Sequence, residues 1–113
     1  MDSIDVYSQY FEAEMEVMGF VRHGALVKLI VTSGEGNVKY EAAVAIFNHL
    51  DEEDYCVPYD VYYTKELYNE PGIRSKAREV DMLVHLHEVI DELLAPDGGK
   101  VFWDKPLQEE RRG

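Results

Sequence analysis

Apolar and acidic residues alternate through the stretch 11–21. The odd positions are apolar and glutamates separate them: Phe11, Ala13, Met15, Val17 and Val21 against Glu12, Glu14 and Glu16. A period of two sends successive side chains to opposite faces of a β-strand, so the pattern predicts a strand with one face in water. The segment 4–10 has the opposite parity, which predicts that it extends this strand through a β-bulge near Tyr10.

Two further strands follow, and each is preceded by a turn. The segments 25–32 and 38–47 are rich in apolar residues, and 25–32 is apolar and β-branched at both parities, as a central strand would be. Residues 22–25 and 33–37 contain glycine, which can adopt the positive φ of a tight hairpin. They therefore predict the two turns of an antiparallel meander.

The second half of the chain changes to a helical period. A fourth strand is expected at 55–63, at a sheet edge or with a bulge, because Pro58 has no N–H to donate. The segment 64–69 is expected to form at most one helical turn. Ser75 is a suitable N-cap for a helix that runs to Leu94. Apolar residues form one stripe along this helix: Met82, Leu83, Leu86, Val89, Ile90, Leu93 and Leu94.

The predicted fold is therefore α+β, an antiparallel β-meander of four to five strands followed by one long amphipathic helix packed on the sheet. Residues 100–103 are the candidate fifth strand. Residues 1–107 are expected to form a single domain, and 108–113 a polar tail.

The positions of the turns set a register. Pairing Arg22 with Ala25 and Thr32 with Val38 places apolar side chains on both faces of the sheet. One helix covers only one face, and large exposed apolar patches are unusual in monomers. We therefore expect a homodimer, with cover by the two terminal arms as the alternative.

The charge of the chain limits its partners. It has 23 acidic residues against 11 lysines and arginines, a formal net charge of -12. Binding to nucleic acid or to an anionic membrane needs clustered cations, so neither is expected. The chain shows no signal peptide and no apolar run that could span a bilayer, and its single cysteine, Cys56, suits a reducing compartment. A cytoplasmic protein is predicted.

Motifs for catalysis or cofactor binding are absent from the sequence. There is no nucleophile elbow, P-loop or dinucleotide fingerprint, so neither an enzyme nor a cofactor is predicted. His85 and His87 would point about 200° apart on a helix and cannot share a metal ion. Asp81, His85 and Glu88 share one flank, but surface charge pairs are the better interpretation. We predict no metal site.

Tyrosines and acids gather in the segment 51–70. The acids are Asp51, Glu52, Glu53 and Asp54, and the tyrosines are Tyr55, Tyr59, Tyr62, Tyr63 and Tyr68. Tyrosine is enriched at interfaces, so this surface could dock a basic protein. Alternatively, alternate tyrosines of the fourth strand face the core. Our leading hypothesis is a small, acidic, non-enzymatic protein-interaction module.

A small-molecule site is the second hypothesis. In the register above, Lys28 lies mid-strand beside the small residues Gly19 and Ala42. An ammonium group in such a niche could bind an anionic ligand in a pocket between sheet and helix. The simpler interpretation is that the stem of Lys28 covers the sheet and its head reaches water.

Overall fold

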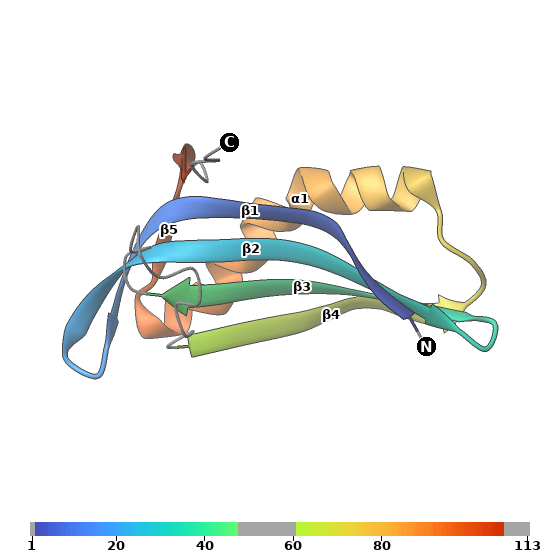
Figure 1. Ribbon diagram of the computed structural model, residues 1–113, viewed down its shortest axis with the longest axis horizontal. Coiled ribbons are helices and arrows are strands. Elements are labelled where there is room, and N and C mark those ends of the chain that lie inside the picture. Colours follow the sequence, from blue (N-terminus) through green and yellow to red (C-terminus); the bar gives the residue numbers. More distant parts are fainter. Residues whose placement is uncertain (1, 48–60, 108–113) are drawn as a thin grey trace, which may run out of the picture.

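The computed structural model describes residues 2–47 and 61–107 (Figure 1). In this part of the chain an antiparallel five-stranded sheet is followed by one helix on one of its faces, which confirms the α+β prediction. The elements are β1 (Asp2–Val17), β2 (Phe20–Gly34), β3 (Asn37–Phe47), β4 (Val61–Pro71), α1 (Lys76–Leu94), a 3₁₀ turn η1 (Ala95–Asp97) and β5 (Lys100–Leu107).

The strands lie in the order β4-β3-β2-β1-β5. Strands β1 to β4 form a meander, and α1 lies behind the sheet and crosses its strands obliquely (Figure 1). The last strand, β5, pairs with the middle of β1. The first and last strands of the described chain are therefore neighbours, and β4 and β5 are the edges.

The β1–β2 and β2–β3 hairpins each close through a two-residue turn with positive φ. Met18 and Gly19 have φ of 53° and 85°, and Glu35 and Gly36 have φ of 55° and 77°. The turn predicted at 22–25 is wrong, because these residues lie inside β2. The first hairpin is consequently longer than predicted, and it projects beyond the sheet (Figure 1).

The pairing of β2 with β3 differs by one residue from the predicted register. Val38 pairs with Ser33 rather than Thr32, which changes the cross-strand neighbours of every residue in β2. The face toward α1 is apolar, and its buried side chains pack on Leu86, Ile90 and Leu94 of the helix. The strand residues of this core are Phe11, Ala13, Met15, Ala25, Val27, Leu29, Ala42, Val44, Ile46 and Val101.

The face away from α1 is apolar at one end, where Leu26, Ala45 and Phe47 form a buried cluster with Tyr10 and Leu107, and it is mixed along the rest of the strands. One row across β1 to β4 reads Ser8, Lys28, Ala43 and Thr64, and a neighbouring row reads Asp5, Ile30, Glu41 and Glu66. The expectation of a homodimer rested on a second face that is apolar throughout. The observed face is apolar only around the Leu26 cluster, and the homodimer stays a prediction.

Three local predictions are corrected and one is confirmed. The segment 64–69 is part of β4, not a helical turn, and β5 continues to Leu107. The irregularities of β1 lie between Asp5 and Tyr7 and between Glu12 and Met15, not at Tyr10. The helix begins as predicted, because the Ser75 side chain accepts a hydrogen bond from the Arg78 backbone N–H.

Among the described residues, no helix combines the length and the apolar character that crossing a membrane requires.

Candidate functional site

Six of the nine residues of the predicted tyrosine and acid surface lie outside the described residues. They are Asp51, Glu52, Glu53, Asp54, Tyr55 and Tyr59. Cys56 also falls outside. The structure therefore tests the placement of only Tyr62, Tyr63 and Tyr68.

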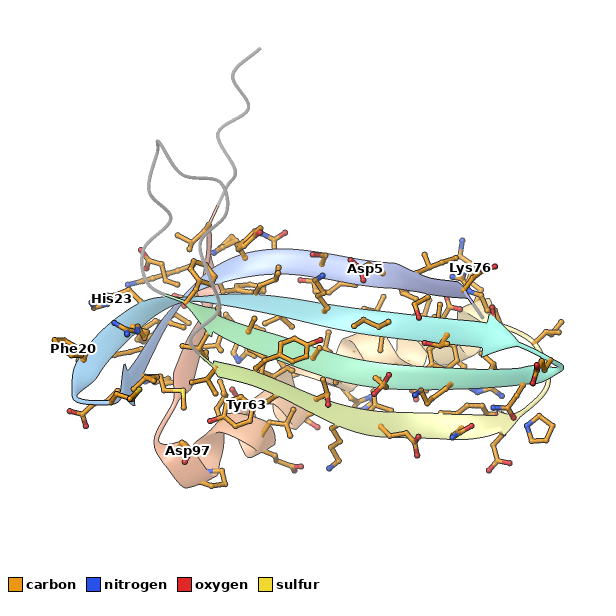
Figure 2. The ribbon with its side chains drawn as sticks, turned by 60° about the horizontal axis from the view of Figure 1, so that its bottom comes forward. Asp5, Phe20, His23, Tyr63, Lys76 and Asp97 are labelled. Atoms are coloured by element: carbon orange, nitrogen blue, oxygen red, sulfur yellow. The ribbon has the colours of Figure 1, made fainter. Side chains whose placement is uncertain are left out.

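These three tyrosines do not form one surface. Tyr62 is 53% exposed and pairs with Ala45 on the face away from α1. Tyr63 is half-buried on the opposite face, and its hydroxyl donates to Asp97 Oδ2 at 2.5 Å (Figure 2). Burial, and then the Asp97 carboxylate, raise the pKa of Tyr63 to about 12. Tyr63 therefore fastens η1 to the sheet.

Tyr68 is also engaged within the chain. Its ring packs edge-on against Tyr40, with centroids 6.0 Å apart, and the Arg78 guanidinium lies 4.1 Å from its centroid. This contact explains one of the cations at the start of the helix, where the macrodipole disfavours positive charge.

The start of the helix is held by a buried charge network. Glu79 is buried, with 8% of its surface exposed. It accepts two 3.0 Å hydrogen bonds from the Arg74 guanidinium and one of 2.6 Å from the Tyr40 hydroxyl. The bonds from Arg74 chiefly, and then that from Tyr40, hold the pKa of Glu79 below its ordinary value. This arrangement is structural, because every charge in it is matched inside the chain.

Lys28 does not line a pocket between sheet and helix. It lies on the other face, between Ser8 and Ala43, with 26% of its side chain exposed. Its ammonium is 3.3 Å from a carboxylate oxygen of Asp5. A groove of about 180 Å³ does exist between α1 and the sheet, lined by Tyr7, Leu83, Leu86, His87 and Trp103. The described residues of that lining include no lysine or arginine to attract an anion.

The two histidines of the helix have separate surroundings. His85 Nδ1 donates to the Asp81 carbonyl at 3.0 Å, and this bond, ahead of the nearby carboxylates, raises the pKa of His85. His87 packs edge-on against Trp103, with centroids 6.1 Å apart. Within the described ranges, no three histidine, cysteine or acidic side chains are placed to hold a metal ion.

Three exposed apolar side chains lie together at the end of the β1–β2 hairpin. Met18 is 92% exposed, Phe20 66% and Val21 44%. We call these three residues the hairpin tip. Figure 2 shows Phe20 beyond the main body of the sheet. Sequence reasoning missed this feature, because it placed the turn at Gly24 and assigned Met18 to Val21 to a strand.

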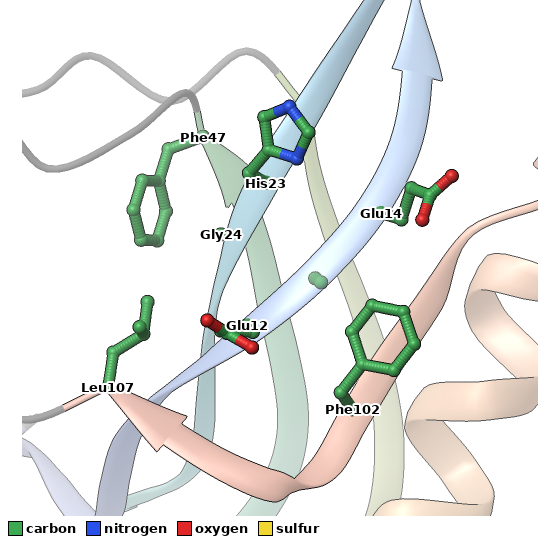
Figure 3. Close-up of a pocket in the computed structure, with 8 residues that line it drawn as sticks. Glu12, Glu14, His23, Gly24, Phe47, Phe102 and Leu107 are labelled. Carbon is green, nitrogen blue, oxygen red and sulfur yellow. The ribbon is translucent and has the colours of Figure 1, made fainter.

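A pocket opens at the base of the same hairpin (Figure 3). It has a volume of about 240 Å³, and its lining residues are Glu12, Ala13, Glu14, His23, Gly24, Phe47, Phe102 and Leu107. We call it the base pocket. Two irregularities form it: the shift in β1 after Glu12, and a larger shift in β5 after Phe102.

The polar groups of the base pocket are two carboxylates and an imidazole, beside two phenyl rings. A lysine of β5 lies next to it: Lys105 Nζ is 3.9 Å from Glu12 Oε2 and 5.5 Å from the Phe102 centroid. The Lys100 ammonium is 5.3 Å from the same ring. This arrangement attracts cations, because carboxylates and aromatic faces both favour positive charge.

Comparison with known proteins gives no relative: no protein-family model, curated protein or solved structure matches this chain.

Proposed function

We propose that the chain is a small, non-enzymatic protein-interaction module that presents its β1–β2 hairpin to a basic protein partner. The observation that carries this proposal is the 92% exposure of Met18 at a turn that methionine disfavours.

Methionine is an unusual residue at the first position of a two-residue hairpin turn. Two-residue hairpins with positive φ at both positions favour Asn-Gly or Asp-Gly, because few side chains accept the left-handed region. Methionine at φ 53° costs about 1 kcal/mol there. Residues that break a local rule without a compensating contact are candidates for function. An extended methionine suits docking, because its flexible thioether fits irregular apolar sockets.

Phe20 and Val21 complete an apolar tip at the end of a projecting arm. Binding energy at protein interfaces concentrates in a few such apolar and aromatic anchors, each of which fills a pocket on the partner. The hairpin tip therefore favours the proposal that the partner is a protein with an apolar socket.

The negative charge of the chain favours the proposal that the partner is basic. The glutamates Glu14 and Glu16 of β1 are both exposed just before the tip, and the whole chain carries a formal net charge of -12. Complementary charge steers two proteins together and speeds their association, and added salt screens this effect. A basic rim around the apolar socket would match this end of the molecule.

Site-specific photo-cross-linking tests the proposal, because the chain offers a matched control. A benzophenone amino acid is placed at Met18 in one variant and at Glu35 in another, and both variants are expressed in the source cells. Both positions lie in two-residue turns with φ near 55°, at opposite ends of β2.

We expect a discrete protein adduct from position 18 and none from position 35. The adduct should decrease as salt rises, and excess unlabelled chain should compete for it, whereas excess M18S/F20S chain should not. Equal labelling from both positions, or an adduct indifferent to the M18S/F20S competitor, would contradict the proposal.

A further inference from the structure

The geometry points to the base pocket as the receptor for a guanidinium group, an arginine side chain of the partner that displaces Lys105. This inference rests on the proposed function, since it names the basic group that the partner inserts beside the hairpin tip.

The acids of the pocket lie on one face. Glu12 and Glu14 are two residues apart in β1, both exposed, and both line the pocket. Glu12 pairs across the sheet with Phe102 of β5, which brings a phenyl ring beside the carboxylates. Figure 3 shows Glu12 on β1 and Phe102 on the neighbouring β5, and both residues line the pocket. A flat cation could pair with the carboxylates and stack on the ring.

Lys105 shows that the site accepts a cation. Its ammonium lies 3.9 Å from Glu12 and faces the Phe102 ring at 5.5 Å, so it already makes both kinds of contact. The contact is loose, because 59% of the Lys105 side chain is exposed and the residue lies in the irregular part of β5 between Phe102 and Pro106. An ion pair this exposed contributes little, so a better cation can replace it.

Glu14 pairs across the sheet with Lys100 of β5, but the two side chains make no ion pair. Within the described residues, no lysine or arginine lies within ion-pair distance of its carboxylate. A guanidinium has five donors in a planar fork, whereas an ammonium is a single point of charge. The volume of about 240 Å³ admits the end of an arginine side chain.

The pocket and the hairpin tip belong to one surface. Glu14 and Met18 are four residues apart in the same hairpin, so they are separated by about 14 Å at the rise of an extended strand. One protein partner can therefore place an apolar socket on the tip and an arginine in the pocket.

The test uses N-acetyl-arginine methylamide as the probe and the matching citrulline compound as the neutral control. Binding is followed through the backbone amide signals of Ala13, His23 and Gly24 in nitrogen–proton NMR spectra of the full chain. We expect saturable shifts at millimolar arginine compound and none with the citrulline compound.

Three variants sharpen the test. E12Q/E14Q should abolish the shifts, whereas E16Q, on the same strand outside the pocket lining, should bind like the unmodified chain. K105Q should bind the probe about two- to fivefold more tightly, because an internal competitor lowers the apparent affinity by the fraction of time that it fills the site.

Shifts with the citrulline compound, shifts that survive E12Q/E14Q in a folded chain, or weaker binding by K105Q would each overturn the inference. Its failure is separable from that of the proposed function. M18S/F20S should bind the probe normally, and cross-linking at position 18 does not require the free probe to bind.

Discussion

The hydroxyl of Tyr40 lies 2.6 Å from a carboxylate oxygen of Glu79, which joins the middle of the sheet to the first turn of the helix. Glu79 also receives both hydrogen bonds from Arg74, so a single buried carboxylate fixes where the helix meets β3. The stability of the chain should therefore depend on the charge of this one side chain.

Replacing Glu79 by glutamine should cost about 2–3 kcal/mol, because the hydrogen bonds to a charged group are lost in a buried site. The pKa of Glu79 is lower in the folded chain than its ordinary value of 4.5. Its stabilising effect is therefore complete above about pH 4.5 and is lost as the pH falls through the folded pKa. Urea denaturation between pH 7 and pH 3 measures this.

The control for that experiment is Glu88→Gln, since Glu88 is exposed on the same helix. E88Q should keep the acid-dependent loss of the unmodified chain, whereas E79Q should show a flatter acid profile. Equal profiles for E79Q and the unmodified chain would argue against a special role for Glu79.

The Tyr63 hydroxyl should lose its proton at a higher pH than an ordinary tyrosine. Its pKa is about 12 in the folded chain, against an ordinary value of 10.0. Since folding raises this pKa, the contribution to stability is complete below about pH 10 and disappears as the pH rises toward 12. Asp97→Asn should move the pKa back toward 10, because it removes the charge that opposes the tyrosinate. The ring-carbon NMR signal of Tyr63, followed with pH, reports the change, and an unmoved pKa in D97N would contradict it.

Gly24 should tolerate no side chain while Phe47 is present. A Cβ at this position would overlap the Phe47 ring. Gly24→Ala should therefore destabilise the chain by about 1–3 kcal/mol, as overpacked sites do. In a Phe47→Leu background the penalty should shrink, which a double-mutant cycle of urea denaturation curves detects. Additive effects would show that the ring is not the cause.

Met18→Asn should stabilise the fold and weaken partner binding together. Asparagine accepts the left-handed region, so the free energy of unfolding should rise by about 0.5–1 kcal/mol. Glu35→Asn changes the equivalent position of the other hairpin and should stabilise the fold without affecting the partner. Thermal unfolding and competition for the cross-linked adduct measure the two effects. Loss of stability in M18N would contradict the strain argument.

The sequence predicted those elements whose signals are local. The N-cap at Ser75 and the apolar stripe through Leu86 and Ile90 lie within the helix itself, and the helix is found where they place it. The alternation from Phe11 to Met15 likewise predicted which β1 residues are buried.

The predicted register of β1 and β2 was wrong because a glycine at position 24 is compatible either with a turn or with a close contact inside a strand. A glycine that follows polar residues, as Gly24 follows Arg22 and His23, typically marks a turn, and the actual turn at Met18 carries a residue that turns disfavour. Gly24 is instead required by the aromatic ring of another strand, a contact that local sequence does not reveal. One wrong turn moved every pairing between β1 and β2.

The candidate site was only half predictable. The shared face of Glu12 and Glu14 follows from their spacing, which the sequence shows directly. Phe102 and Lys105 reach them through the pairing of β5 with β1, and no local pattern predicts which edge a last strand joins. A site built from both ends of the chain requires the topology before it can be recognised.

The same topology sets an order of assembly. As the chain is synthesised, β1 to β4 can pair in turn, but the stretch from Tyr10 to Glu14 gains its second neighbour only when residues 100–107 have been made. Until then the strand that carries the pocket acids has an open hydrogen-bonding edge, which invites pairing with other chains. The carboxylates of Glu12 and Glu14 on that strand would repel a second copy until β5 has been made, and this repulsion would disfavour pairing between nascent chains.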